Sequence, residues 1–462
     1  MTEVSDMKAA INRREFMQRS VVGAAAAPLL THVLGHEAEA SAGGASPNDR
    51  IQVGMIGVGA RCLQGSGLLD AVVAVPGVQV LGVCDAYKGR VTRALSNLGG
   101  KAKDYGDYHA LLADKSIDAV VIATPDLWHK PLALAALAAG KDVYLEKPMT
   151  LAIDEGPEMY GAAEKAGRIL QIGSQGKSSK LQETAREIIK SGKLGQINLV
   201  RASFDRNSES GAWIYPIPPD ADPKTVNWDL FLGSAPKRPF SLERFFRWRC
   251  FRDYSGGIST DLFVHLMTTI HYVMDATVPE TVVATGANYR HQKTHEVPDT
   301  LNASAVYGKE NFSVSLSGTF NSASAGESGF AIMGNEGSLV FREDRMVFTP
   351  EHVVEGNGWI VSSWPTELEK AYWADPAVQK KEKPDTWPAQ MWSRGESWTE
   401  VGPDATYIHM GRFFESVRTR RPSVEDGRTG HHAAAVAHMV NESIKRKGPV
   451  SWDFEKDVLK KA

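Results

Sequence analysis

The chain has 462 residues, of which 42% are hydrophobic and 23% charged, with a formal net charge of −3 at pH 7. This length predicts up to about three domains, and the composition is that of a soluble globular protein, which excludes collagenous, disordered and multi-span membrane classes. The nearly balanced charge argues against a nucleic-acid-binding protein, since such proteins normally present a basic surface.

The first 40 residues differ in kind from the rest of the chain. Arg13 and Arg14 precede an apolar stretch from Val21 to Leu30, and Ala38-Glu39-Ala40 follows. The stretch is too short for a stable bilayer-spanning helix, and the order resembles a twin-arginine export signal, residues 1–40, cleaved near Ala40. A disordered or amphipathic tail is the alternative. We therefore expect a periplasmic or otherwise exported protein that uses the twin-arginine machinery, without stable membrane insertion.

A βαβ pattern follows a polar linker, residues 41–49. A strand is predicted from Ile51 to Ile56, then the turn Gly57-Val58-Gly59, a helical segment and a second strand from Val78 to Cys84. Gly57 permits a tight turn, and Gly59 lets backbone amides approach a pyrophosphate at a helix N-terminus. The pattern predicts a dinucleotide-binding unit.

Asp85 ends the second predicted strand, where a carboxylate can accept hydrogen bonds from the adenosine ribose. This favours NAD, while Lys88 and Arg90 leave NADP open. The third small position of the turn holds Cys62 in place of Gly or Ala, which requires the thiol to pack inside. The three cysteines of the chain are widely spaced and odd in number, so we predict neither disulfides nor a Cys-based zinc site.

Two specific motifs follow later strands. They are Thr124-Pro125-Asp126-Leu127-Trp128-His129, after the strand Ala119 to Ala123, and Glu146-Lys147-Pro148. Further on come Gln171-Ile172-Gly173-Ser174-Gln175, Asn227-Trp228-Asp229, Gly256-Gly257 with Asp261 and His265, and Val450-Ser451-Trp452-Asp453. From about residue 50 to the C-terminus, the chain resembles the Gfo/Idh/MocA family, which includes glucose-fructose oxidoreductase and inositol dehydrogenase.

The resemblance implies an α/β fold in two domains. A Rossmann domain with a doubly wound parallel sheet is expected over residues 50–172, and a substrate-binding α+β domain with a large, mostly antiparallel open sheet over residues 173–462. It also implies that Glu-Lys-Pro lies beside the nicotinamide. The expected cofactor-binding residues are Gly57, Gly59, Ala60, Arg61, Asp85, Thr124, Pro125, Trp128, His129, Glu146, Lys147 and Gln175.

Hydride removal from a secondary alcohol requires a base near the hydroxyl group, and histidine suits neutral pH. Asp261 and His265 are four residues apart, so a helix places both on one face and the carboxylate can orient or charge-stabilise the imidazole. Lys147 supplies a cation for developing alkoxide character. We predict these three residues to be catalytic; a local helix contact and a surface lysine are the alternatives. The family commonly has a further Asp where this chain has Thr268, so recognition of the substrate hydroxyls is expected to differ.

Two pairs of histidines have spacings that could suit metal ligands. His291 and His295 lie in a polar connection, and His431 and His432 are sequence neighbours that point apart on a helix. Neither pair has a clear third ligand, so no required metal is predicted.

Strand patterns dominate the second region. Residues 312–320 alternate apolar with small hydroxyl side chains, and similar short runs occur at 197–204, 281–288, 330–333 and 338–341. The Ser/Thr face is either a hydrated surface or, as the resemblance implies, the contact of a homo-oligomer.

Six of the eleven tryptophans fall in an irregular, Pro-containing insertion at about 351–403: Trp359, Trp364, Trp373, Trp387, Trp392 and Trp398. Aromatic faces stack on sugar rings, so the insertion is a hypothetical lid or wall of the substrate cleft, in the same or a neighbouring subunit. An insertion that merely needs its own aromatic anchors is the alternative.

Export constrains the chemistry, because a folded protein carried by the twin-arginine route would take its NAD along and retain it. The favoured function is hydride transfer between tightly bound NAD and a sugar, glycoside or cyclitol, since Glu146-Lys147-Pro148 is the ordinary dehydrogenase form. One alternative is a redox-neutral, NAD-dependent glycoside hydrolase that acts through a transient 3-keto sugar. Another is a noncatalytic sugar-binding or sensor protein.

Overall fold

The computed structural model describes residues 50–324, 329–342, 344–351, 356–381 and 395–461. The predicted export signal, the linker, Trp387 and Trp392 lie outside these residues. Within the described part, every helix is too short or too polar to cross a bilayer.

The first sheet is parallel, with strand order β3-β2-β1-β4-β5-β6. Its strands are β1 Ile51–Ile56, β2 Val78–Cys84, β3 Lys103–Asp104, β4 Ala119–Ile122, β5 Asp142–Glu146 and β6 Leu170–Gly173. Strands β4 and β5 are buried throughout, as expected when helices cover both faces of a parallel sheet. The strand order reverses between β1 and β4, and ligands bind such sheets beside the carboxyl ends at this point.

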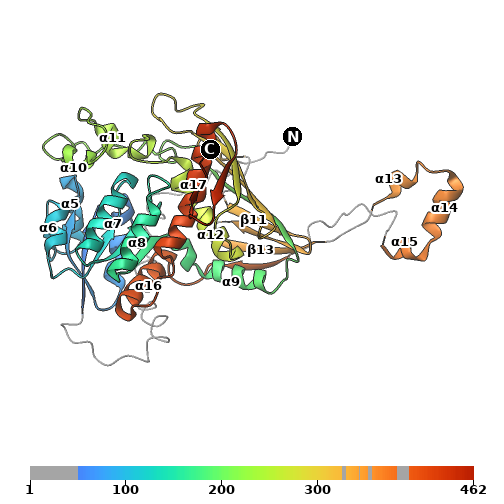
Figure 1. Ribbon diagram of the computed structural model, residues 1–462, viewed down its shortest axis with the longest axis horizontal. Coiled ribbons are helices and arrows are strands. Elements are labelled where there is room, and N and C mark those ends of the chain that lie inside the picture. The colour runs from blue at the N-terminus through green and yellow to red at the C-terminus, as the bar shows by residue number, and fades with distance from the viewer. Residues whose placement is uncertain (1–49, 325–328, 343, 352–355, 382–394, 462) are drawn as a thin grey trace, which may run out of the picture. The chain divides into compact units, whose positions relative to one another are not determined.

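Helices on both faces complete this layer (Figure 1): α3 Ala60–Leu63, α4 Leu68–Ala74, α5 Lys88–Asn97, α6 Tyr108–Ala113, α7 His129–Ala138 and α8 Gly156–Ala166. A helix from far along the chain, α16 Ala405–Thr419, packs here as well. Its Met410, Phe413 and Phe414 share an apolar core with Leu68 and Val72 of α4. The region after residue 172 therefore contributes to both layers, because the apolar side of α16 is buried against the first layer.

The second sheet is mixed, with strand order β14-β13-β12-β11-β7-β10-β9-β8-β15-β16. Its strands are β7 Ile197–Asp205, β8 Thr281–Ala287, β9 Thr300–Tyr307, β10 Phe312–Thr319, β11 Gly329–Gly334, β12 Gly337–Arg342, β13 Arg345–Pro350, β14 Glu396–Thr399, β15 Val450–Asp453 and β16 Val458–Leu459. Only the β7–β10 pair among these described strands is parallel. The expected two-sheet α/β fold is thus confirmed.

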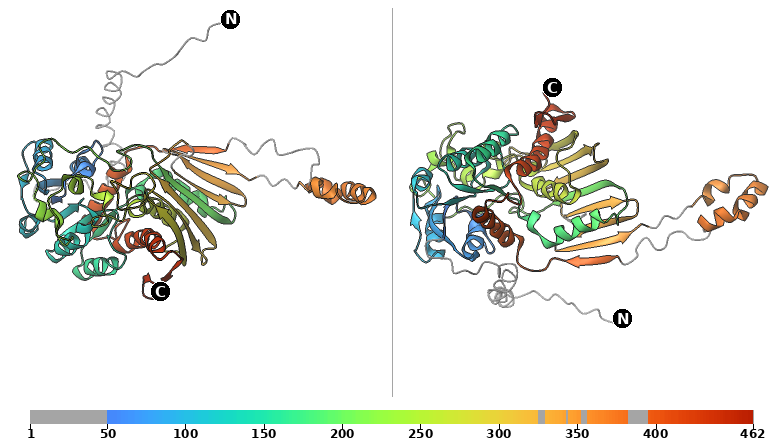
Figure 2. Two further views of the ribbon diagram at one scale, coloured as in Figure 1. Left: turned by 90° about the horizontal axis from the view of Figure 1, so that it is seen from above. Right: turned by 60° about the horizontal axis from the view of Figure 1, so that its bottom comes forward.

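Three helices cover one face of this sheet (Figure 2): α9 Lys180–Lys190, α12 Val264–Met274 and α17 Gly427–Arg446. The alternation in the strands explains why only one face is covered. In β9, Leu301, Ala303 and Ala305 are buried, whereas Asn302 and Ser304 between them are exposed. Side chains of successive residues point to opposite faces of a strand, so the hydroxyl-rich face points away from the helices.

An irregular connection, residues 206–258, joins β7 to the helices at the site, and we call it the cap segment. It contains α10 Trp228–Leu232, α11 Leu242–Phe246 and the short helical turn η5 Trp248–Cys250. A π-helical turn, η6 Ser259–Phe263, then leads directly into α12. The Trp-rich insertion contributes α13 Gly358–Val361, α14 Thr366–Ala374 and α15 Pro376–Lys381.

Candidate active site

A cavity of about 820 Å³ extends from the carboxyl ends of the first sheet to the cap segment and α12. It is lined by eleven of the twelve residues expected to bind the cofactor: Gly57, Gly59, Ala60, Arg61, Asp85, Thr124, Pro125, Trp128, Glu146, Lys147 and Gln175. The remaining two residues predicted to be catalytic, Asp261 and His265, line it too. The structure therefore brings residues from both layers to one cavity.

The glycine turn after β1 has the geometry that a close backbone approach requires. Gly57 has a φ of 82°, and a Cβ built on it would lie 2.5 Å from the carbonyl oxygen of Ala123. At Gly59 the nearest atom, in the Arg90 side chain, would be 3.6 Å away. Cys62 is fully buried and its thiol donates to the Gly57 carbonyl over 3.2 Å, so this unusual third residue fits the turn.

We expect Gly57→Ala and Gly59→Ala to fail in different ways. The first forces a side chain into the left-handed region, which costs about 1–2 kcal/mol before the clash with Ala123 is counted. It should lower the melting temperature by several degrees. Gly59→Ala should melt like the wild type but co-purify with less dinucleotide, because its methyl group enters the cavity. Differential scanning calorimetry measures the melting temperature, and acid release measures the bound nucleotide. Equal melting temperatures for both variants would contradict the conformational role given to Gly57.

Asp85 is held beside this turn. Its carboxylate accepts hydrogen bonds from the backbone N–H groups of Val58 and Tyr87, each over 2.9 Å. Arg90 Nη1 lies 3.6 Å from Oδ1 of the same carboxylate. The position of Asp85 suits two unsubstituted ribose hydroxyls, and Arg90 beside it suits a 2′-phosphate.

The cap segment closes over this end of the cavity. Lys88 N donates to Thr225 O over 2.9 Å, and Asn227 N donates to Ala86 O over 2.7 Å, on either side of a bridge between Tyr87 and Val226. The indole of Trp128 also donates to the Phe231 carbonyl over 2.9 Å. Aromatic side chains of the segment line the cavity here: Phe231, Phe245 and Phe246.

The cavity wall carries polar atoms without partners. Thr124 Oγ1, Gln175 Oε1 and Thr268 Oγ1 are buried, and each makes no hydrogen bond among the described residues. Buried polar atoms normally have partners, so these three point to a polar ligand. Together with the glycine turn and Asp85, they show that the residues present fit a nicotinamide dinucleotide.

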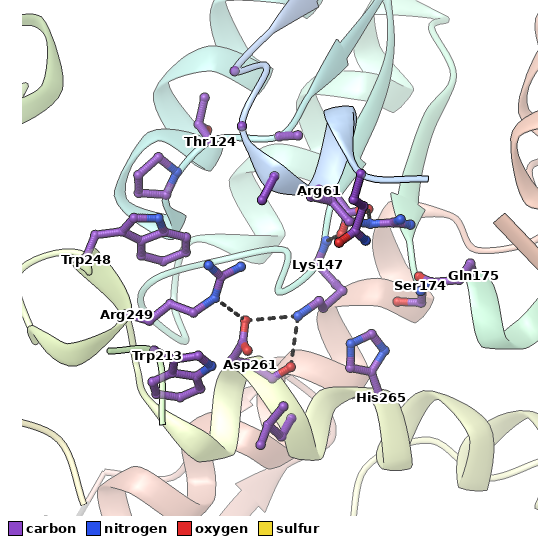
Figure 3. A pocket seen from close by; sticks show the side chains of 18 of the residues that line it. Arg61, Thr124, Lys147, Ser174, Gln175, Trp213, Trp248, Arg249, Asp261 and His265 are labelled. Carbon is purple, nitrogen blue, oxygen red and sulfur yellow. Dashed lines mark hydrogen bonds and ion pairs between the residues drawn. The ribbon is translucent and has the colours of Figure 1, made fainter. Parts of the chain in front are cut away.

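Lys147 belongs to a buried cluster of charges at the centre of the site (Figure 3). Its ammonium lies 3.0 Å from Asp261 Oδ1 and donates to the Asp261 carbonyl over 2.9 Å. Arg249 Nε lies 3.0 Å from the same carboxylate oxygen. Burial opposes ionisation of Asp261, but the charges of Arg249 and Lys147 hold its pKa well below the usual value. The carboxylate therefore fixes both cations.

His265 is the second residue of α12, one turn after Asp261, and its ring faces the cavity beside Lys147 (Figure 3). Among the described hydrogen bonds, none joins the Asp261 carboxylate to this ring; Lys147 and Arg249 both contact Oδ1 of that carboxylate. Burial, followed by the Lys147 charge, lowers the pKa of His265 to about 3, against a weaker opposing effect of Asp261. The ring is neutral at physiological pH and is oriented without the expected carboxylate contact.

His129 differs from the other expected cofactor residues, because it lies outside the cavity lining and is only 1% exposed. Its Nδ1 faces the Pro148 carbonyl at 2.6 Å and its Nε2 faces the Thr124 carbonyl at 3.1 Å. His129 is therefore buried beneath the cavity lining, where it connects the loop after β4 to the loop after β5 by hydrogen bonds.

Asp126 is a buried carboxyl that sequence reasoning did not single out. It is 2% exposed, and its Oδ2 has no hydrogen-bond partner among the described residues. Burial, followed by the negative charge of Asp261, raises the pKa of Asp126 to about 8. Asp126 is therefore protonated at neutral pH and adds no negative charge to the cluster of Lys147, Arg249 and Asp261, whose net charge stays positive.

This pKa predicts how stability depends on pH. A carboxyl with an ordinary pKa near 4 in the unfolded chain takes up a proton on folding between about pH 4 and pH 8, so the free energy of unfolding falls as pH rises through that range. Asp126→Asn removes this dependence. We expect its melting temperature, relative to the wild type, to rise by several degrees between pH 5 and pH 8. The exposed Asp154→Asn serves as the control, and an equal difference at both pH values would contradict the prediction.

Other residues of the cavity were also missed. Arg206, Trp213, Tyr215, Trp248 and Arg249 line it, all from the cap segment. The sequence had suggested that the tryptophan insertion forms the aromatic wall of the substrate cleft. Its described tryptophans, Trp359, Trp364, Trp373 and Trp398, do not line the cavity.

One histidine of each pair, His295 and His432, is bonded to another group. His295 Nε2 lies 2.7 Å from the Ala212 carbonyl, and His432 Nε2 lies 2.9 Å from Asp457 Oδ1. In the parts of the chain with assigned positions, His, Cys, Asp and Glu form no group of three that could hold a metal ion.

Two sequence-family models match the chain. Residues 51–174 match "Oxidoreductase family, NAD-binding Rossmann fold" of the Gfo/Idh/MocA group, and residues 222–452 match "Oxidoreductase family, C-terminal alpha/beta domain" of the same group. Together they cover both layers around the cavity.

Similar proteins support the same grouping. Inositol 2-dehydrogenase of Salmonella typhimurium is 36% identical over 148 residues, 32% of this chain and 43% of that protein. A glycosyl hydrolase family 109 protein of Solibacter usitatus is 36% identical over 132 residues, 26% of this chain and 30% of that protein. The matches thus span less than half of these curated relatives. The structure of levoglucosan dehydrogenase with NADH and levoglucosan has a TM-score of 0.61 at 18% identity, covering 87% of this chain and 99% of that one, which shows a shared fold.

Proposed function

Because this chain belongs to the Gfo/Idh/MocA oxidoreductase family, we propose that it transfers a hydride between a retained nicotinamide dinucleotide and a secondary hydroxyl group of a sugar, glycoside or cyclitol. The observation that carries the proposal is the Lys147 ammonium, which lies between Asp261 and His265 in the cavity that also contains the Gly57 turn. The dinucleotide, when bound, supplies the hydride acceptor.

The residues of this chain have distinct parts in the step. The Lys147 ammonium donates a hydrogen bond to the substrate oxygen and stabilises the negative charge that develops there. His265, neutral and unbonded to Asp261, takes the hydroxyl proton. The Asp261 carboxylate holds Lys147 in place over 3.0 Å, and Arg249 supports the same carboxylate.

Retention of the cofactor and export belong to the same proposal. The cap segment docks onto the residues after β2 through the Tyr87–Val226 bridge, and Tyr87 also donates its hydroxyl to Asp220 over 2.5 Å. We infer that these contacts help to retain the dinucleotide. A captive cofactor is what an exported enzyme needs, and the order of Arg13-Arg14, apolar stretch and Ala38-Glu39-Ala40 supports the twin-arginine route to the periplasm.

A homo-oligomer through the second sheet is also part of the proposal. The face of β8 and β9 opposite the helices includes two exposed valines, Val283 and Val306, which are 47% and 45% exposed, among small polar side chains. An uncharged flat face of this kind favours association. Sedimentation equilibrium of the mature protein tests it.

The experiment that tests the function needs no added cofactor. The mature protein is purified, its bound nucleotide is identified by mass spectrometry, and sugars, cyclitols and aryl glycosides are added one at a time. Stable absorbance of reduced nicotinamide supports the proposal, and the mass distinguishes NAD from NADP. A protein without nucleotide that also fails to bind any added would overturn it.

A glycoside hydrolase is the second candidate, because a glycosyl hydrolase family 109 protein is 36% identical to this chain over 132 residues. In that case oxidation would be transient and the cofactor would end in its starting state. Aglycone release from aryl glycosides without net reduction distinguishes this function in the same assay. Sugar binding with neither reduction nor aglycone release indicates a noncatalytic sensor.

A further inference from the structure

Charges in the cavity are balanced at its dinucleotide end. Arg61 Nε lies 2.9 Å from Glu146, and Arg90 lies 3.6 Å from Asp85. Each of these cations has its own carboxylate, so this end contributes little net charge.

The opposite end has an excess of positive charge. Lys147 and Arg249 share a single carboxylate, that of Asp261. Arg206 also lines the cavity and has no carboxylate within ion-pair distance among the described residues. Asp126, a further acidic group beside this cluster, is buried, and that burial, followed by the charge of Asp261, raises its pKa. Glu400 also lines the cavity, and its carboxylate accepts hydrogen bonds from the Ser179 hydroxyl and from the backbone amides of Lys180 and Leu181. Among the described residues, Lys147, Arg249 and Arg206 therefore have a single ion-paired carboxylate between them, that of Asp261.

Arg206 has donors to spare. It follows the last residue of β7, and Nη1 donates to the Gly211 carbonyl over 3.2 Å. A guanidinium group has five N–H donors in a planar fork, and this fork matches an oxyanion. One backbone contact fixes the side chain and leaves most of the fork available to a ligand.

The loop that carries Arg206 into the cavity is rigidly built. Within it Trp213 is 1% exposed and adopts a left-handed conformation with φ 61°, which a tryptophan rarely does. The Ala212 amide donates to Ser208 O over 2.9 Å, and His295 Nε2 lies 2.7 Å from the Ala212 carbonyl. Strained residues persist only where their surroundings fix them, and they cluster at ligand sites.

Arg206 also acts on the residues of the chemical step. The low pKa of His265 is caused mainly by burial and by Lys147, and the charge of Arg206 adds to it. Burial raises the pKa of Tyr215, and the charges of Arg249 and Arg206 oppose that rise. Arg206, Tyr215 and His265 all line the same cavity.

We propose that the substrate is an anionic sugar, whose negatively charged oxygen group is bound by Arg206 while Lys147 and His265 hold the hydroxyl that reacts. This rests on the proposed function and adds the class of sugar to it. A cation that loses water in a cavity is stabilised when a ligand supplies the opposite charge, whereas a neutral sugar leaves it uncompensated. Carboxylate, sulfate and phosphate groups share this chemistry.

The test compares sugars that differ only in charge. The protein with its retained dinucleotide is given hexuronates and the corresponding neutral hexoses, together with hexose 6-sulfates and 6-phosphates. We expect kcat/KM for one anionic series to exceed that for the neutral series by about 10- to 100-fold, the range of a charge-assisted hydrogen bond. The preferred series identifies carboxylate, sulfate or phosphate. Arg206→Gln should remove most of this preference, mainly through KM.

Matched controls keep the outcomes distinct. Arg201→Gln removes an exposed arginine of the same strand, β7, and should keep the preference. Calorimetric binding of the same sugars is measured in all three proteins, because it does not depend on turnover. The anionic-sugar proposal is overturned if charged and neutral sugars bind equally, if neither class binds, or if Arg206→Gln keeps the preference. Reduction of the retained cofactor by any of these sugars still supports the proposed function. Preferential binding of anionic sugars without any reduction supports the anionic-sugar proposal and contradicts the proposed function.

Discussion

Lys147→Met lowers the turnover number by about 10³-fold while the purified variant still contains its dinucleotide. The ammonium lines the cavity together with His265, and removal of one donor to a developing oxyanion typically costs about 10²–10³-fold in rate. Methionine keeps the length of the side chain without the charge. Asp261 stays bonded to Arg249 over 3.0 Å. The loss of stability should therefore be smaller than the about 3–5 kcal/mol that follows when a buried charge loses its only partner.

Lys141→Met separates this effect from a general cost of removing a buried lysine. Lys141 is 5% exposed, and its ammonium donates to the carbonyls of Asp114 and Ile117, away from the cavity. We expect this control to melt at a lower temperature and to keep its turnover number. Single-turnover reduction of the retained dinucleotide, followed by stopped-flow absorbance, measures the step directly. A Lys147→Met variant with more than a tenth of the wild-type rate would remove Lys147 from the mechanism.

Local chemistry explains why the first half of the site could be predicted from sequence. The turn at Gly57 depends on residues within a few positions of each other, and the bounds of β1 and β2 agree with the predicted strands. Asp85 follows β2 directly, so its place at the edge of the sheet was determined by the length of that strand. Even the unusual Cys62 needed only a neighbouring carbonyl, that of Gly57, as its partner.

The substrate end could not be predicted in this way, because its residues come from the irregular cap segment. Arg206, Trp213 and Arg249 carry no periodic pattern, and they reach the cavity through contacts with distant segments, such as His295 against Ala212. The contact predicted between the side chains of Asp261 and His265 was also wrong. Helical spacing suggested His265, but an arginine twelve positions earlier and a lysine from the other layer take the carboxylate.

The tryptophan insertion shows the limit of arguing from composition. Aromatic residues suit both sugar binding and self-anchoring, and Trp364 packs against Tyr372 at 5.4 Å between ring centroids while Trp398 packs on the core of the second sheet. These contacts agree with the anchoring alternative for Trp364 and Trp398, whereas Trp359 is 77% exposed, and a lid over the cleft of a neighbouring subunit stays a prediction. Two tryptophans that do line the cavity, Trp213 and Trp248, lie far in sequence from any other tryptophan, so no local density of tryptophans marked them.

His265→Gln should lower the rate of hydride transfer by about 10²–10⁴-fold, the usual contribution of a general base. Glutamine keeps a hydrogen-bonding side chain of similar size but cannot accept the proton. His271→Gln, on the same helix α12, is the matched control, because His271 bonds to the Tyr307 hydroxyl over 2.7 Å and does not line the cavity. We expect the control to keep its rate, and both variants to retain the dinucleotide.

The pH dependence sharpens this prediction. Because burial and Lys147 lower the pKa of His265 to about 3, its neutral, proton-accepting form predominates at every pH above about 4. The wild-type rate should therefore show no loss between pH 7 and pH 5 from protonation of this ring, although an ordinary histidine would lose activity near pH 6.5. A base of low pKa can still act, since the hydroxyl proton becomes strongly acidic as the hydride leaves and a carbonyl forms. Rates measured by stopped flow from pH 5 to pH 8 test this, and an acid limb near pH 6.5 that disappears in His265→Gln would show that the ring lies in a far more polar setting than the structure gives it.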